Sequence, residues 1–205
     1  MTESGRVVCG RRLCPTCGRP TARCYCSLVI RIPSKVRLVI WQHPSEENHP
    51  KGTASLLHAC LPNSQLVVSE QLNREVLLKQ VGLSREVQPV LLFPSDNHQP
   101  KPVSNQESPA ALLALDGTWR KARKLLYLNP WLLELPRLSL DDLDTQVTGN
   151  YRVRKAEKPG QLSTLESCCM ALAQMEQNTG KFDPILTAFE AYMQQLEQFR
   201  PNHGT

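Results

Sequence analysis

Short runs of apolar and β-branched residues alternate with segments of helical spacing along most of this chain. The runs that predict strands lie at residues 36–41, 65–68, 89–93 and 111–115, with weaker candidates at 137–140 and 151–154. The segments that predict helices lie at 54–60 behind a capping Thr53, at 73–81, 118–128, 163–178 and 184–199. Short hydrophobic strands that alternate with helices favour an α/β fold with a mostly parallel, covered sheet.

The composition is ordinary for a soluble globular protein. A chain of 205 residues can form one sizeable core with a small appendage, and 40% of its residues are hydrophobic while 21% are charged. No segment approaches the ~18 consecutive apolar residues of a membrane span, and the first residues lead into no apolar signal core. We therefore expect a cytoplasmic protein with no membrane partner, whose thiols stay reduced.

Four of the eight cysteines form two closely spaced pairs near the start of the chain. The pairs are a CxxC at Cys14 and Cys17 and a CxC at Cys24 and Cys26. Four thiolates suit a tetrahedral zinc ion, and the CxxC spacing lets two of them reach one ion from a single turn. A disulfide or a redox CxxC is the competing interpretation, but no βαβ unit precedes the motif. The spacing predicts a structural zinc site.

The remaining cysteines do not join this predicted site. Cys9 lies further upstream, while Cys60, Cys168 and Cys169 have apolar neighbours that predict buried thiols. We expect residues 1–34 to form a four-cysteine zinc-binding segment and residues 35–205 to form the main domain.

The segment around Asp116 is the strongest candidate for a functional turn. A short apolar run ends in Asp116, Gly117, Thr118 and Trp119, and a basic segment at 120–124 follows at once. This order predicts a buried strand, a tight turn and a helix with a basic outer face. Ligands bind at the carboxyl ends of strands in open α/β sheets, so Asp116 stands where chemistry is expected.

Cations are unevenly distributed in this chain, whose formal net charge is +5. Six arginines and a single acidic residue, Glu3, occupy the first 31 residues, and further clusters lie at 120–124 and 152–158. Clustered cations favour a polyanionic partner, although a solvated basic face explains any single cluster equally well. The three clusters together favour a nucleic acid.

Five blocks of sequence, in a fixed order, resemble the DTW-domain family and within it the bacterial tRNA-uridine aminocarboxypropyltransferases. The blocks are CxxC…CxC, Gln42-His43-Pro44-x-Glu46, Phe93-Pro94, Leu115-Asp116-Gly117-Thr118-Trp119, and Tyr151-Arg152-Val153-Arg154-Lys155 followed by Leu162-Ser163-Thr164-Leu165-Glu166. They run from about residue 14 to residue 170, which is most of the chain. The chain has Glu166-Ser167 where the family more often has Glu-Ala, a change between small residues.

The resemblance implies a SPOUT-like fold, in which a mostly parallel sheet ends in a C-terminal knot that binds S-adenosylmethionine. It also implies transfer of the 3-amino-3-carboxypropyl group of S-adenosylmethionine to N3 of a tRNA uridine. The implied target is the variable-loop uridine, position 47 in tRNA numbering, and the implied products are acp3U and methylthioadenosine. tRNA is the expected partner, and no obligate protein partner is evident.

The resemblance also implies roles for individual residues. The expected catalytic residues are Asp116, Thr118 and Trp119. The expected residues around S-adenosylmethionine are Phe93, Pro94, Leu115, Gly117, Leu162, Ser163, Thr164 and Glu166. The expected RNA-binding residues are His43, Arg120, Arg123, Lys124, Arg152, Arg154 and Lys155.

Several of these roles have structural alternatives. Asp116 could be the general base that removes the proton from uridine N3, or it could cap the following helix. Trp119 could line the pocket, stack on a base or belong to the core. Glu166 could hold the amino group of the co-substrate or be an exposed helix carboxylate. His43 fits an RNA phosphate contact, proton transfer or a satisfied loop histidine.

Two rival functions remain at this stage. A SPOUT-type RNA methyltransferase would use the same co-substrate and fold but transfer a different carbon. A zinc-ribbon RNA-binding protein without catalysis would only present basic surfaces. The mass of the modified nucleoside separates the first rival, and binding of S-adenosylmethionine separates the second.

Overall fold

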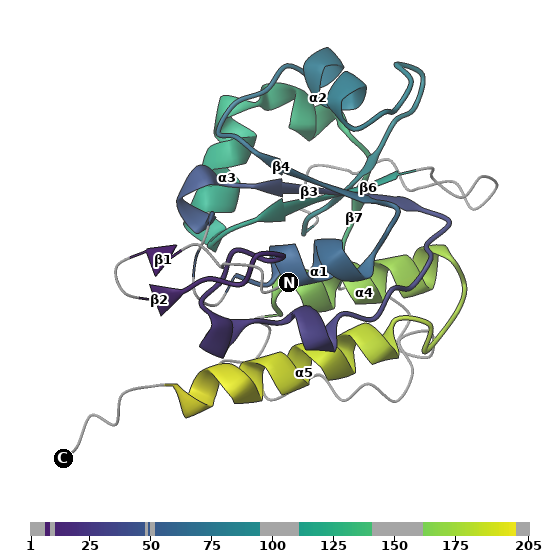
Figure 1. The fold of residues 1–205 in the computed structure, drawn as a ribbon. Coiled ribbons are helices and arrows are strands. Elements are labelled where there is room, and N and C mark those ends of the chain that lie inside the picture. Colours follow the sequence, from purple (N-terminus) through teal and green to yellow (C-terminus); the bar gives the residue numbers. More distant parts are fainter. Residues whose placement is uncertain are drawn as a thin grey trace.

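A computed structural model describes residues 7–8, 11–47, 49, 52–94, 111–140 and 162–199. A single parallel sheet forms the centre of the molecule and helices lie on both of its faces (Figure 1). The sheet consists of β3 (Arg37–Gln42), β4 (Ser64–Val68), β5 (Val90–Leu92), β6 (Ala111–Asp116) and β7 (Arg137–Leu138). The strand order is β4-β3-β6-β5-β7, and every neighbouring pair is parallel. The predicted α/β class is therefore confirmed.

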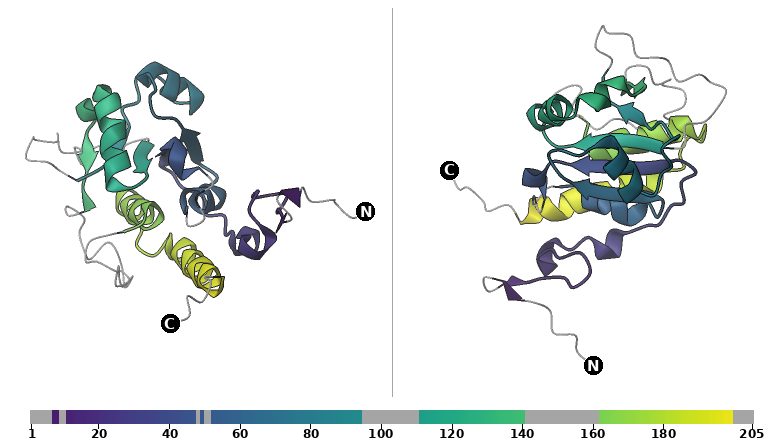
Figure 2. Two further views of the ribbon diagram at one scale, coloured as in Figure 1. Left: turned by 90° about the vertical axis from the view of Figure 1, so that its left-hand side faces the viewer. Right: turned by 90° about the horizontal axis from the view of Figure 1, so that it is seen from above.

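The helices cover the two faces of the sheet unequally. One face carries α1 (Ala54–Cys60), α4 (Thr164–Met175) and α5 (Asp183–Gln198). The other face carries α2 (Arg74–Gln80), α3 (Trp119–Leu128) and the short 3-10 helix η4 (Pro130–Glu134). The views in Figure 2 show the sheet enclosed between these groups. The helices expected at 54–60, 73–81, 118–128, 163–178 and 184–199 are thus present.

The central strands are hydrophobic on both faces because both faces are covered. In β3, Leu38 and Ile40 pack with α1 and α4, whereas Val39 and Trp41 pack with α2 and α3. None of these four side chains is more than 1% exposed. Successive residues of a strand face opposite sides, so a strand covered on both sides must be apolar throughout.

Side-chain hydrogen bonds cap the N-termini of α4 and α2, but not that of α1. Ser163 and Glu166 form a reciprocal capping box at the start of α4, and the Asn73 side chain accepts from the Glu75 N–H at the start of α2. Thr53 occupies the N-cap position of α1 as expected, but its side chain makes no capping hydrogen bond. The capping role predicted for Thr53 is therefore wrong, because its helical backbone angles, φ −98° and ψ −15°, differ from those typical of a capping residue.

The N-terminal segment, shown in purple in Figure 1, packs against α5. The Tyr25 ring meets the Tyr192 ring edge-on, with centroids 5.6 Å apart, and the Gln195 side chain donates to the carbonyls of Ala22 and Cys24. The Arg19 guanidinium lies over both rings and donates to the Gly52 carbonyl. The segment is therefore attached to the main core, and the boundary at residue 34 stays a prediction.

Parts of the sequence-based interpretation fall outside the described residues. The weak strand candidate at 151–154 is among them. The predicted C-terminal knot also stays a prediction, because residues 141–161 between β7 and α4 are not described. Of the helices that are described, none is long and apolar enough to cross a membrane.

We expect Asn129→Ala to lower the free energy of unfolding by about 3 kcal/mol. Asn129 is 1% exposed; its amide donates to the carbonyls of Leu125 and Glu70, and its oxygen accepts from the Leu72 N–H. Removing the side chain takes this partner from the Leu72 N–H and the Glu70 carbonyl, whereas the Leu125 carbonyl keeps its bond to the Asn129 N–H. Denaturant unfolding measures the loss, with the exposed Asn178→Ala as control; equal stabilities for the two variants would contradict the expectation.

Candidate functional site

A cavity of about 230 Å³ opens at the carboxyl edge of the sheet, beside the first turns of α3 and α4. The lining residues come from the ends of β5, β6 and β7 and from those two helices. They are Leu92, Phe93, Pro94, Ala114, Leu115, Gly117, Trp119, Ala122, Leu138, Ser139, Leu140, Leu162, Thr164 and Ser167. Most of these residues are apolar and three carry hydroxyl groups, a mixture found in small-molecule sites.

Most of the residues predicted to surround S-adenosylmethionine meet at this cavity. The predicted residues in its lining are Phe93, Pro94, Leu115, Gly117, Leu162 and Thr164, together with Trp119. The prediction missed the wall formed by residues 138–140 and by Ser167. Residues 137–140 were a weak strand candidate, and the residues that follow any strand of a parallel sheet reach this same edge.

The turn between β6 and α3 requires glycine at position 117. Gly117 has φ of 157°, and a Cβ built on it would lie 3.1 Å from the Lys121 Cβ. Next in the chain, the Trp119 ring meets the Phe93 ring edge-on, with centroids 5.7 Å apart and an interplanar angle of 75°. The turn thereby places a half-exposed indole at the wall of the cavity.

Asp116 lies at this edge, but its side chain is not part of the cavity lining. The side chain is 7% exposed, and its Oδ2 accepts a hydrogen bond of 2.7 Å from Gln42 Nε2 on β3. The neighbouring Thr118 is the N-cap residue of α3, and no side chain caps that helix. The carboxylate is therefore held by Gln42, and helix capping does not explain it.

Ser163 and Glu166 cap the N-terminus of α4. The Glu166 Oε2 accepts from the Ser163 N–H at 2.8 Å and from its hydroxyl at 2.7 Å. Glu166 is 6% exposed, so the interpretation as an exposed helix carboxylate is wrong. Neither residue lines the cavity, whereas their neighbours Leu162 and Thr164 do. The capping box fixes the turn that presents those neighbours.

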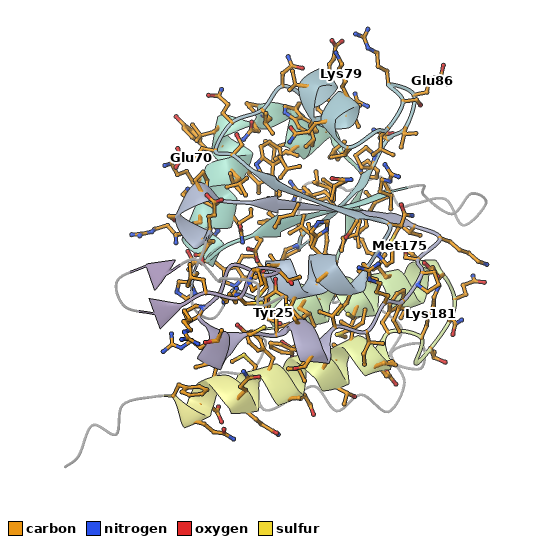
Figure 3. All side chains as sticks on the ribbon, in the orientation of Figure 1. Tyr25, Glu70, Lys79, Glu86, Met175 and Lys181 are labelled. Carbon is orange, nitrogen blue, oxygen red and sulfur yellow. The ribbon has the colours of Figure 1, made fainter. Side chains whose placement is uncertain are left out.

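Two lysines of α3 are paired with acids that follow β3 and β4. Lys121 Nζ lies 2.6 Å from Glu46 Oε1, and Lys124 Nζ lies 2.7 Å from Glu70 Oε1. The Lys124 hydrogen bond lowers the pKa of Glu70, helped by the charges of Lys124 and His43. Figure 3 shows Glu70 beside α3. These contacts attach α3 to the edge of the sheet.

His43 is buried within the same group of residues. It is 6% exposed, and its Nδ1 accepts from the Ser45 N–H. Its Nε2 lies 2.9 Å from Glu70 Oε1, within ion-pair distance but not aligned for a hydrogen bond. The ring is buried against protein groups, but Nε2 has no hydrogen-bond partner among the described residues, so the role of His43 stays a prediction.

The other predicted RNA-binding residues divide into two sets. Arg120 and Arg123 are exposed on α3, and within the described residues neither forms an ion pair. Lys124 is also exposed but pairs with Glu70. The remaining candidates, Arg152, Arg154 and Lys155, lie outside the described residues.

The four N-terminal cysteines converge on one point. Their sulfur atoms all lie within 4.8 Å of one another, and the Cys14–Cys26 and Cys17–Cys24 sulfur separations are both 3.7 Å. A tetrahedron of zinc–sulfur bonds of about 2.3 Å has edges of roughly 3.8 Å. The four cysteines form no disulfide, and the donor set and its spacing fit a closed zinc site.

The surroundings of Cys14, Cys24 and Cys26 shift the pKa values of these thiols in opposite directions; we call the segment from Cys14 to Cys26 the knuckle. The N–H groups of Cys17 and Thr16 lower the pKa of Cys14 to about 6. Burial instead raises the pKa of Cys24 and Cys26. Metal coordination requires thiolates, so zinc binding at neutral pH must release protons from the latter pair.

The cysteines predicted to be buried are buried. Cys60, Cys168 and Cys169 are at most 1% exposed. Burial raises the pKa of each thiol, and the nearby Asp116 charge adds to the effect on Cys168. They act as core residues rather than as nucleophiles.

A family model described as "DTW domain" matches residues 11–197 of this chain. Three animal proteins, each named "tRNA-uridine aminocarboxypropyltransferase 2", are similar to this chain. The chain is 30% identical to the one from Mus musculus over 97% of its own length and 65% of that protein. It is 28% identical to the one from Macaca fascicularis over 93% of its length and 64% of that protein. For the one from Drosophila melanogaster, identity is 31%, over 81% of this chain and 67% of that protein.

The chain thus spans about two thirds of the length of the curated relatives it matches. No solved structure gives a significant match.

We expect Cys14→Ser to abolish stoichiometric zinc binding and to lower the melting temperature of the zinc-loaded protein. Loss of one thiolate opens a closed four-sulfur site whose knuckle is attached to α5. Zinc content by elemental analysis, with melting curves, measures both effects. Cys9→Ser is the control; if it lost the metal while Cys14→Ser kept it, the assigned ligand set would be wrong.

Proposed function

Because this chain belongs to the DTW-domain family, we propose that it is a tRNA-uridine aminocarboxypropyltransferase. In this proposal the 3-amino-3-carboxypropyl group of S-adenosylmethionine moves to N3 of a tRNA uridine, giving acp3U and methylthioadenosine. The variable-loop uridine is the proposed target, tRNA the partner and the cytoplasm the location. A SPOUT-like C-terminal knot belongs to the same proposal.

One observation carries this proposal: motif residues far apart in the sequence meet around one cavity at the carboxyl edge of the sheet. Phe93 follows β5, Gly117 follows β6 and Thr164 begins α4, and all three line it. These positions lie in three of the blocks by which the chain resembles the family. A shared cavity explains why separate blocks would be parts of one site.

The cavity offers groups suited to both halves of S-adenosylmethionine. Phe93 and Trp119 supply aromatic surface against which a purine can pack, and Ser139, Thr164 and Ser167 supply hydroxyl groups for polar atoms. When bound, the sulfonium supplies an activated carbon with a good leaving group. The protein must select which of the three carbons on sulfur is attacked, which is a problem of orientation.

We propose Asp116 as the general base. Uridine N3 carries a proton that must leave before the nitrogen can attack, and a nearby carboxylate can accept it. Alternate residues of a strand face the same side, so Asp116 shares the α4 face of β6 with Ala114. Ala114 lines the cavity together with Thr164 and Ser167 of α4, and a uridine that enters there approaches the carboxylate. The Gln42 amide, which donates to Oδ2, fixes the orientation of the carboxylate and leaves Oδ1 as the candidate acceptor.

The zinc knuckle has a structural role in this proposal. A closed four-thiolate site leaves no open coordination position for a substrate. The knuckle packs on α5 through Tyr25 and Arg19, and these residues are not part of the cavity lining. Zinc would therefore stabilise the N-terminal segment and take no part in the transfer.

We expect Asp116→Asn to lower the single-turnover rate of acp3U formation by about 100-fold or more while tRNA binding is retained. The amide keeps the size and can still meet Gln42, but it cannot accept the N3 proton at neutral pH. Unmodified tRNA and S-adenosylmethionine are the substrates, and nucleoside mass spectrometry measures the product.

Glu75→Gln is the matched control, because Glu75 is an exposed carboxylate on α2, paired with Arg85 and not part of the cavity lining. A near-normal rate for Asp116→Asn would remove the base assignment. A methylated nucleoside from the unaltered protein would instead indicate a methyltransferase, and no modified nucleoside at all would contradict the proposed activity.

A further inference from the structure

Helix α3 carries an exposed stripe that begins at the cavity. Trp119, Arg123 and Tyr127 are spaced four residues apart, so they follow one side of the helix over about 12 Å. Trp119 is 49% exposed and lines the cavity, and Tyr127 is 83% exposed. Arg123 is exposed between them. We call these three residues the α3 stripe.

The cations of α3 are not equivalent. Lys121 and Lys124 are engaged by Glu46 and Glu70, and these pairs lie toward the edge of the sheet. Arg120 and Arg123 are exposed, and the described part of the chain gives neither an acidic partner. The lysines therefore hold the helix in place, and the arginines present positive charge outward.

We infer that the α3 stripe binds the unpaired nucleotides that flank the target uridine, stacking a base on Tyr127 and holding phosphate with Arg123. The inference rests on the proposed function and names the part of the tRNA that meets this surface. Aromatic rings stack on base faces, which unpaired nucleotides expose and duplexes hide. An arginine between two aromatic rings suits the phosphates that join such bases.

A role in the core and a role in a protein interface both fit the α3 stripe less well. A core role requires burial, and the Tyr127 ring is almost fully exposed. A stable protein interface needs a broad contact surface with an apolar centre, whereas Tyr127 lies one helical turn from Arg123 and from the paired Lys124. Trp119 belongs both to the stripe and to the cavity lining. A tRNA whose uridine enters the cavity would therefore lie next to the stripe.

The test measures the equilibrium binding of unmodified tRNA by fluorescence anisotropy, without any chemical step. We expect Tyr127→Ala to raise Kd about tenfold and Tyr127→Phe to leave it within about twofold, since the ring alone carries stacking. Arg123→Gln should also weaken binding and reduce the salt dependence by about one phosphate contact. None of these exposed substitutions should change the melting temperature.

Two variants away from α3 serve as matched controls. Phe199→Ala removes an aromatic ring, 42% exposed, at the end of α5, which lies beyond the opposite face of the sheet (Figure 1). Arg85→Gln removes an exposed guanidinium that pairs with Glu75. Both should bind tRNA as the unaltered protein does.

The outcomes separate this inference from the proposed function. Unchanged tRNA binding by Tyr127→Ala would overturn the inference even if acp3U is formed. An equal loss of affinity for a blunt RNA duplex would overturn it as well, because a duplex has no unpaired bases. Binding that depends on Tyr127 without formation of acp3U would support the inference and contradict the proposed reaction. A change of oligomeric state in Tyr127→Ala, with tRNA binding intact, would indicate a protein interface instead.

Discussion

The parallel pairing of β3 with β6 is the constraint on which the rest of the structure depends. The two strands are in register from Arg37 opposite Ala111 to Gln42 opposite Asp116, and helices cover both of their faces. Polar side chains are therefore excluded from most of their length and appear where the strands end. The last register pair is polar, and the hydrogen bond between its side chains sits at the border between the core and the cavity edge.

The sequence allowed the helices and strands to be predicted closely because both signals are local. Buried strands such as β6 are short and apolar, and helices such as α5 repeat apolar residues every three to four positions. The strand order β4-β3-β6-β5-β7 could not be predicted, because it depends on contacts between segments far apart in the chain. The failed cap at Thr53 has a similar cause, since the cap depends on backbone angles that the residue type does not determine.

For the candidate site, the positions of several lining residues could be predicted, but the partners of polar side chains could not. Turns that follow strands converge on one edge of a parallel sheet, which explains why Phe93 and Gly117, grouped by the family resemblance, line one cavity. The partners of side chains could not be assigned. Gln42 lies 74 residues from Asp116 and Glu46 lies 75 residues from Lys121, and no local pattern links either pair. The same limit left the burial of Glu166 unforeseen.

The zinc knuckle reaches the cavity edge through a chain of contacts. Arg19 donates to the carbonyl of Gly52, just before α1, and to the hydroxyl of Ser55, within α1. A few residues upstream, Glu46 pairs with Lys121 of α3. The Cβ of Lys121 lies next to the backbone of Gly117, which lines the cavity. Four thiolates fixed by one ion would restrain Arg19, and Arg19 in turn restrains the segment that carries Glu46. A metal ion bound by the four cysteines would in this way stabilise the edge of the sheet that forms the cavity, although it lies outside the cavity lining.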